Sequence, residues 1–166
     1  MAADSPAKKP GIGPQAPVRV NLSRGVRGSI PARRALAHWV GVAAAGRVRQ
    51  PAELGLRIVG AAEARALNRR FRGRDYATNV LSFEASRVAR RRDRLLGDLI
   101  VCAPVVAREA RAQGKCLRAH WAHLIIHGTL HLLGYEHRRP ADARRMERRE
   151  TRLLRGLGYP DPYVVA

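Results

Sequence analysis

The sequence of 166 residues has few cysteines and no long apolar run, and each shortage limits what the protein can be. Its two cysteines, Cys102 and Cys116, lie fourteen residues apart and form no CxxC pair. This argues against a thiolate zinc site and a disulfide scaffold, and it is typical of a reducing cytoplasm. The best apolar stretch, residues 35–45, is too short to cross a bilayer, and no signal peptide is evident. We therefore expect a cytoplasmic protein without a membrane partner.

Acidic residues are also scarce, at 13 against 32 lysines plus arginines, for a formal net charge of +19. Only Lys8, Lys9 and Lys115 are lysines. Guanidinium groups donate paired hydrogen bonds to phosphates, and a positive field of this size attracts polyanions. A general preference for arginine on solvated helices would explain the missing lysines but not the missing acids. We therefore predict a nucleic-acid partner whose binding weakens as salt rises.

The hydrophobic pattern predicts one α+β domain, residues 18–166, after a flexible N-terminal tail. Residues 1–17 contain four prolines and no periodicity, which is typical of a tail. Apolar runs predict strands near residues 18–22, 54–58, 80–83 and 99–102. Helical spacing or helix-end residues predict helices over residues 31–46, around 67–71, and over 104–114, 117–133 and 140–157. Together they indicate a small, about four-stranded mixed sheet packed against several helices.

Five of the six histidines lie between residues 120 and 137, in AHWAHLIIHGTLHLLGYEH. Residues four apart on a helix lie about 6 Å along its axis and about 40° around it, so their imidazoles can bind one ion. This permits His123 with His127, or His127 with His131. Because His123 and His131 are roughly 12 Å apart along the axis, they cannot both reach an ion through bonds of about 2 Å.

A third histidine chooses between these pairs. Gly134 can take the left-handed conformation that ends a helix and reverses the chain, which brings His137 towards His131. His127, His131 and His137 are therefore the predicted ligands of one Zn²⁺ on a central helix, and His123 packs or supports them. Three neutral nitrogens without an obvious fourth ligand are typical of catalytic zinc. Imidazole also binds nickel, copper or iron, so another divalent metal remains open. A single histidine on the apolar face of a helix is more often a hydrogen-bonded core residue than a metal ligand.

This spacing matches the metzincin protease signature H-E-x-x-H-x-x-G-x-x-H, including its glycine at Gly134. The glutamate of that signature, the general base for peptide hydrolysis, is replaced here by Gly128. Glu136 is the nearest acid in sequence, but it lies beyond the turn. The pattern therefore predicts the metal geometry of these proteases without their chemistry.

Upstream, LNRRFRGRDYATNVLSF (67–83) joins the basic end of a helix to a strand. Arg72 is placed in the turn, either as part of a charged turn without function or as a group that projects towards a phosphate beside the metal. With LLGDLIVC (95–102), the histidine segment, residues 146–150 and LGYPDPY (157–163), this segment resembles the YbeY family of bacterial rRNA maturation endoribonucleases.

The resemblance runs from about residue 67 to 163, and more weakly back to 18. It implies a zinc-dependent, single-strand-specific endoribonuclease that acts on the 16S rRNA precursor of the small ribosomal subunit, in 3′-end maturation and ribosome quality control. By the same resemblance His127, His131 and His137 are the metal ligands and Arg72 is the catalytic arginine. The tail and the arginine-rich loop 86–94 depart from the pattern, and Glu136 stands where an aspartate is usual.

Two other functions remain open from the sequence. One is a metal-dependent hydrolase of another substrate, such as a peptide, which the absence of a glutamate at Gly128 disfavours. The other is a non-catalytic rRNA-binding assembly factor in which zinc only stabilises the fold. The second predicts that a chelator unfolds the protein and that RNA binding persists wherever folding does.

Overall fold

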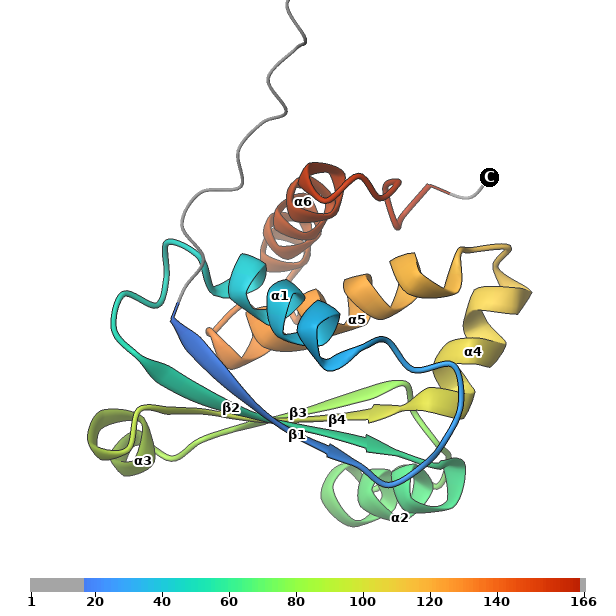
Figure 1. The fold of residues 1–166 in the computed structure, drawn as a ribbon, viewed down its shortest axis with the longest axis horizontal. Helices are drawn as coiled ribbons and strands as arrows, with labels where there is room; N and C mark the ends of the chain where they lie inside the picture. The colour runs from blue at the N-terminus through green and yellow to red at the C-terminus, as the bar shows by residue number, and fades with distance from the viewer. Residues whose placement is uncertain (1–16, 165–166) are drawn as a thin grey trace, which may run out of the picture.

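The computed structural model describes residues 17–164 (Figure 1). All of the predicted tail except Pro17 lies outside the described residues. None of the helices within 17–164 combines the length and the hydropathy that crossing a bilayer requires.

The described chain forms four strands and six helices. They are β1 (Val18–Arg24), α1 (Arg33–Ala44), β2 (Ala52–Val59), α2 (Ala61–Arg72), β3 (Val80–Glu84), α3 (Arg87–Arg92), β4 (Leu95–Cys102), α4 (Ala103–Ala112), α5 (Leu117–Leu132) and α6 (Pro140–Gly156). Each predicted strand and helix is present. The first helix begins two residues after Pro31, and the fourth strand begins four residues earlier than its apolar run. Arg72 is the last residue of α2 and not part of the turn.

The four strands form one sheet in the order β1-β2-β4-β3, in which β3 is antiparallel to β4 and the other neighbours are parallel. The predicted α+β fold with one four-stranded mixed sheet is therefore confirmed. Residues 86–94, the arginine-rich loop, join the antiparallel strands β3 and β4 and contain the short helix α3. No residue of α3 is buried, so its sequence shows no apolar periodicity from which a helix could be predicted.

Helices α1 and α5 cover one face of the sheet, with α6 outside them, and α2 lies against the other face (Figure 1). Most of the apolar core lies between α1, α5 and the sheet. Helix α5 supplies its largest share, because it is apolar around most of its circumference. Its buried hydrophobic residues are Trp121, Ala122, Leu124, Ile125, Ile126, Leu130 and Leu132. Because the core packs tightly around this helix, the directions of its few polar side chains are fixed.

Helix α5 packs tightly against the sheet at Gly128. A Cβ on this residue would lie 2.8 Å from Leu99 Cδ2 and 3.3 Å from both Ser82 Oγ and Val80 Cγ2. A side chain here would force the buried Leu99 side chain to shift, so close packing of helix against sheet favours glycine. The position that carries the base in metzincins faces the sheet and has no room for a side chain.

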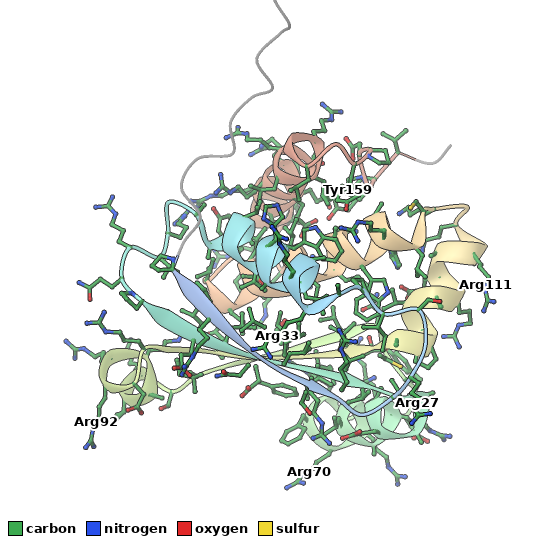
Figure 2. All side chains as sticks on the ribbon, in the orientation of Figure 1. Arg27, Arg33, Arg70, Arg92, Arg111 and Tyr159 are labelled. Carbon is green, nitrogen blue, oxygen red and sulfur yellow. The ribbon has the colours of Figure 1, made fainter. Side chains whose placement is uncertain are left out.

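The arginines are distributed over the outside of the molecule, and none of those in residues 17–164 is buried. Arg70, Arg92 and Arg111 illustrate this, since their side chains extend away from the ribbon on different sides (Figure 2). The positive charge thus lies on the surface, where it can attract a polyanion over a long range.

Candidate metal centre

The three predicted ligands lie together at the C-terminal end of α5. Nε2 of His127 is 3.1 Å from Nε2 of His131, one helical turn further on. The helix ends at Leu132, and Gly134 adopts the predicted left-handed conformation with φ of 92°. The turn places Nδ1 of His137 3.0 Å from Nε2 of His131. The three side chains can thus direct one nitrogen each at a common point.

The outer ring nitrogens of the two helical histidines are both bonded to acceptors. Nδ1 of His127 lies 2.5 Å from Oε1 of Glu150, and Nδ1 of His131 lies 2.9 Å from the carbonyl oxygen of Tyr135. Because neither oxygen can donate, both Nδ1 atoms carry the proton. In the neutral rings the two Nε2 atoms are then bare lone pairs that face each other at 3.1 Å. Two lone pairs at this distance repel, unless a cation lies between them.

The charge state also suits a metal. The pKa of His131 is lowered to about 4, first by burial and then by the neighbouring His127 and His137, against smaller opposing effects of the Tyr135 carbonyl and Glu136. Its imidazole is therefore neutral at neutral pH, which is the form that binds metal. Zinc–nitrogen bonds of about 2.0–2.1 Å in a tetrahedron separate the nitrogens by about 3.3 Å. The observed spacings of 3.0 and 3.1 Å fit an ion of that size.

Glu150 is the residue of this centre that the sequence did not reveal. It lies on α6, its side chain is fully buried, and it accepts hydrogen bonds from His127, His123 and the hydroxyl of Tyr163. Burial alone raises the pKa of the carboxyl, but these bonds outweigh it and hold the pKa at about 2. The sequence did contain a signal for it, since Glu150 lies four residues from both Met146 and Leu154 and so shares their apolar helix face. The structure shows that all three residues are buried.

His123, His127 and Glu150 form a second group whose ligand atoms are close enough to hold an ion. It would use Nδ1 of His127, whereas the first group uses Nε2. A neutral imidazole offers one lone pair, so the two groups exclude each other. The first group lines an open cleft, whereas Glu150 of the second is fully buried.

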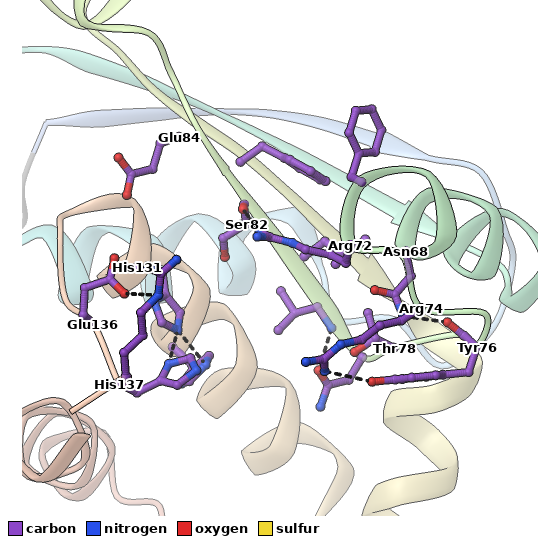
Figure 3. Close-up of a pocket in the computed structure, with 17 residues that line it drawn as sticks. Asn68, Arg72, Arg74, Tyr76, Thr78, Ser82, Glu84, His131, Glu136 and His137 are labelled. Carbon is purple, nitrogen blue, oxygen red and sulfur yellow. Dashed lines mark hydrogen bonds and ion pairs between the residues drawn. The ribbon is translucent and has the colours of Figure 1, made fainter. Parts of the chain in front are cut away.

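The cleft in front of the metal centre has a volume of about 860 Å³ and runs along β3, the edge strand of the sheet (Figure 3). The histidines lie on one side, and the end of α2 with the following turn lies on the other. Three arginines and two glutamates line it: Arg72, Arg74, Arg138, Glu84 and Glu136. The acid nearest to the histidines in sequence, Glu136, thus lies on the cleft.

Arg72 reaches over β3 into this cleft, as Figure 3 shows. Its Nη2 donates to the carbonyl oxygen of Ser82 at 3.0 Å, and its guanidinium carbon lies 5.7 Å from the centre of the Phe83 ring. This holds the group in place while engaging one of its five N–H donors. The structure therefore brings Arg72 to the same cleft as the three histidines, although 55 residues separate it from the first of them.

Tyr76 adds an aromatic surface to the same cleft. Half of its surface is exposed, its hydroxyl accepts from Nη1 of Arg74 at 3.2 Å, and its carbonyl accepts from Asn68 at 2.8 Å. Figure 3 shows the ring across the cleft from the histidines. Sequence reasoning passed over Tyr76, because a tyrosine in a polar turn gives no sign of which surface it faces.

Comparison with known proteins gives consistent results. A family model described as Endoribonuclease YbeY matches residues 30–158. The protein named Endoribonuclease YbeY from Bordetella pertussis is 50% identical over 157 residues, which cover 89% of this chain and 96% of that protein. Its namesake from Stenotrophomonas maltophilia K279a is 48% identical over 156 residues with the same coverage. In Aromatoleum aromaticum the identity is 57% over 117 residues, or 70% of this chain and 73% of the relative.

Among solved structures, the solution structure of TM1509 from Thermotoga maritima has the same fold. It matches with a TM-score of 0.59 and 22% sequence identity, over 84% of this chain and 88% of the other. At this identity the match supports the α+β architecture alone.

Proposed function

This chain belongs to the YbeY family of endoribonucleases, and on that premise we propose that it cleaves single-stranded RNA at a zinc ion held by His127, His131 and His137. The observation that carries the proposal is the pair of bare Nε2 atoms facing each other at 3.1 Å, with a third imidazole nitrogen beside them. A cation satisfies this arrangement, and three neutral nitrogens leave a coordination position for water or substrate.

Zinc held by these three histidines would supply a Lewis acid that activates a water or polarises a phosphoryl oxygen. The chain itself supplies the groups that position the phosphodiester. Arg72 offers its remaining N–H donors to the non-bridging oxygens, where negative charge develops during cleavage. Its contacts with Ser82 and Phe83 hold the guanidinium in place before the substrate binds.

Single-stranded RNA fits the rest of the cleft. The face of a base can stack on an exposed aromatic ring only where the RNA is unpaired, and Tyr76 offers such a ring. Arg74 and Arg138 extend the positive lining along the cleft, where they can contact the backbone. We extend the proposal to the 3′ end of the 16S rRNA precursor in the small subunit, in the cytoplasm, on the strength of the family.

Peptide hydrolysis is disfavoured by the packing of α5. The position that carries the general base in metzincins is Gly128, and it faces the sheet without room for a carboxylate. A peptidase assay with and without chelator tests this alternative, and we expect no peptide cleavage in either condition.

The proposed function is tested by metal analysis combined with cleavage of a 16S rRNA precursor fragment. We expect one zinc ion per chain and cleavage that a chelator abolishes and added zinc restores. The circular dichroism spectrum should show that the protein remains folded after chelation. Two results together would instead support the non-catalytic assembly factor: the chelator unfolds the protein, and the folded protein binds RNA without cleaving it. Cleavage that is unaffected by complete metal removal would overturn the proposal.

The role of Arg72 is tested by Arg72→Ala, with Arg69→Ala, on the exposed surface of the same helix, as the matched control. Because the guanidinium stabilises charge that develops during cleavage, Arg72→Ala should retain zinc and lose about 100- to 1,000-fold in cleavage rate. Arg69→Ala should keep both. Wild-type turnover by Arg72→Ala would remove its role.

A further inference from the structure

We propose that Glu150 is a positioning residue for the metal centre, held by His123 and Tyr163 so that its carboxylate directs the metal-binding nitrogen of His127 towards His131 and His137. This rests on the proposed function for the identity of the ion. It goes further by giving a role to a helix and a C-terminal segment that contribute no ligand.

The first support is the environment of the carboxylate. Glu150 has no exposed side-chain surface, and a buried carboxylate is found in proteins only where donors or charges compensate it. Here three donors do so: His127 through Nδ1 at 2.5 Å, His123 through Nε2 at 3.0 Å, and Tyr163 through its hydroxyl. Packing alone would be better served by a leucine at this position.

The second support is the orientation that the carboxylate imposes. A neutral imidazole can carry its proton on either nitrogen, and an unrestrained ring can turn about its side-chain bonds. The acceptor at Glu150 keeps the proton of His127 on Nδ1 and the lone pair on Nε2, directed at the point where the other two ligands meet. In metal sites, loss of such a partner typically weakens metal binding about 10- to 100-fold.

The third support is the way in which the C-terminal segment is fastened. Oδ1 of Asp161 accepts from the backbone N–H of Tyr163 at 3.0 Å and from the hydroxyl of Thr151 on α6 at 3.3 Å. These bonds tie residues 161–163 to the helix that carries Glu150. The Tyr163 hydroxyl therefore reaches the carboxylate from a segment beyond the last helix.

A different role for Glu150 would be direct ligation of an ion together with His123 and His127. That arrangement requires the two hydrogen bonds from the histidines to be lost, since the same oxygens and ring nitrogens would bind the ion. It also leaves His131 and His137 without a role. The test therefore has to separate a residue that positions a ligand from one that is a ligand.

The test compares Glu150→Gln with Glu109→Gln. Glu109 is a matched control, because it accepts from His120 on the same helix α5 at 2.9 Å, away from the metal ligands. The zinc dissociation constant is measured by competition with a chromophoric chelator, without RNA, and the stability of the metal-free proteins by urea unfolding. We expect the dissociation constant to rise about 10- to 100-fold in Glu150→Gln and to stay unchanged in Glu109→Gln.

Both substitutions should destabilise the metal-free protein, since each disturbs a histidine–carboxylate pair. An unchanged zinc dissociation constant in Glu150→Gln, with stability lost, would reduce Glu150 to a structural residue and overturn the inference. If Glu150→Gln does not fold, Tyr163→Phe replaces it, because that residue is partly exposed and only its hydroxyl is removed. Tyr163→Phe should weaken zinc binding less than Glu150→Gln but measurably, and wild-type affinity in this variant would also count against the inference.

Two further variants show whether the ion is held by His127, His131 and His137 or by His123, His127 and Glu150. If Glu150 positions His127, zinc is lost in His131→Ala and retained, more weakly, in His123→Gln. Loss of zinc in His123→Gln with retention in His131→Ala would identify Glu150 as a ligand and overturn the inference. Because these measurements need no RNA, a failure of RNA cleavage would reject the proposed function and leave this inference standing.

Discussion

Helix α5 carries histidines towards both of its ends, and at each end one of them is paired with a glutamate from another helix. Near the N-terminal end, Nε2 of His120 lies 2.9 Å from Glu109 of α4. Nearer the C-terminal end, Nδ1 of His127 lies 2.5 Å from Glu150 of α6. The two pairs have the same chemistry, but only the second belongs to a group of three imidazoles.

The difference lies in what the other ring nitrogen meets. Nδ1 of His120 is buried and has no hydrogen-bond partner, whereas Nε2 of His127 faces His131, with His137 next to it. Burial lowers the pKa of His120 as well, against the opposing effect of Glu109, so His120 and His131 are both neutral rings at neutral pH. A buried histidine–glutamate pair therefore does not make a metal site. Convergence of several lone pairs does, and it depends on the turn at Gly134.

The largest expected effect comes from removing one histidine at each end. His131→Ala should lose its zinc and its RNA cleavage together, because two nitrogens cannot hold the ion tightly. His120→Ala should lose stability but keep zinc and cleavage at a temperature where it remains folded. Metal content and single-turnover cleavage measure both. A full zinc content and wild-type cleavage in His131→Ala would show that the C-terminal end of α5 does not hold the metal.

A smaller effect is expected at the glycines that follow α4 and α5. Gly134 follows α5 with φ of 92°, and Gly114 follows α4 with φ of 62°, and neither has an atom in the way of a Cβ. Alanine at either position should cost about 1–2 kcal/mol of unfolding free energy, because it must adopt a left-handed conformation. Urea unfolding of the metal-free variants measures this cost.

Only Gly134→Ala should also weaken zinc binding, by up to about tenfold, because relaxing the strained turn displaces His137 and about 1.4 kcal/mol corresponds to a factor of ten. Gly114→Ala serves as the control, because it places alanine in a left-handed conformation at a turn that does not position His137. Equal zinc affinity in the two variants would show that the turn does not hold His137 in place.

The smallest effect is a pH dependence of the metal-free protein. The folded pKa of His131 is about 4, below its ordinary value of 6.5, so at intermediate pH the unfolded chain binds a proton that the folded chain does not. Stability is therefore fully present above pH 6.5 and declines as the pH falls towards 4. His120 contributes in the same direction. Urea unfolding of the metal-free protein at pH 7 and pH 5 measures the decline.

Replacing His131 by Gln should remove more of this pH dependence than replacing His120 by Gln, because the pKa of His131 is lowered to about 4 whereas Glu109 opposes the lowering of the His120 pKa. The unfolding free energy of each variant is compared with that of the wild type at the same two pH values. A wild-type slope in His131→Gln would place the acid sensitivity elsewhere.

Local patterns were sufficient to propose the ligands and to predict most of the fold. The spacing of His127 and His131 and the glycine that follows them are properties of one helix and one turn, so they could be read without knowledge of the tertiary structure. The strands and long helices have apolar runs or spacings of their own. Helix α3 has neither, since it lies on the surface, and it was missed for that reason.

Contacts between distant segments could not be predicted in this way. Glu150 occupies a buried face of α6, and its spacing from Met146 and Leu154 shows that it is unusual but not which histidine it meets. Tyr76 looks like any residue of a polar turn until β3, at the edge of the sheet, places that turn beside the cleft.

The sequence by itself predicted which imidazoles can share an ion, because helical geometry excludes His123 with His131 and the turn at Gly134 favours His127, His131 and His137. It also determined, through glycine at position 128, that the protease base is missing. Only the tertiary structure decided that α6 places a carboxylate behind His127 and that α2 brings Arg72 to the same cleft. The physical reason is that hydrogen bonds reach about 3 Å, so a partner many residues away becomes known only when the packing of the helices against the sheet is known.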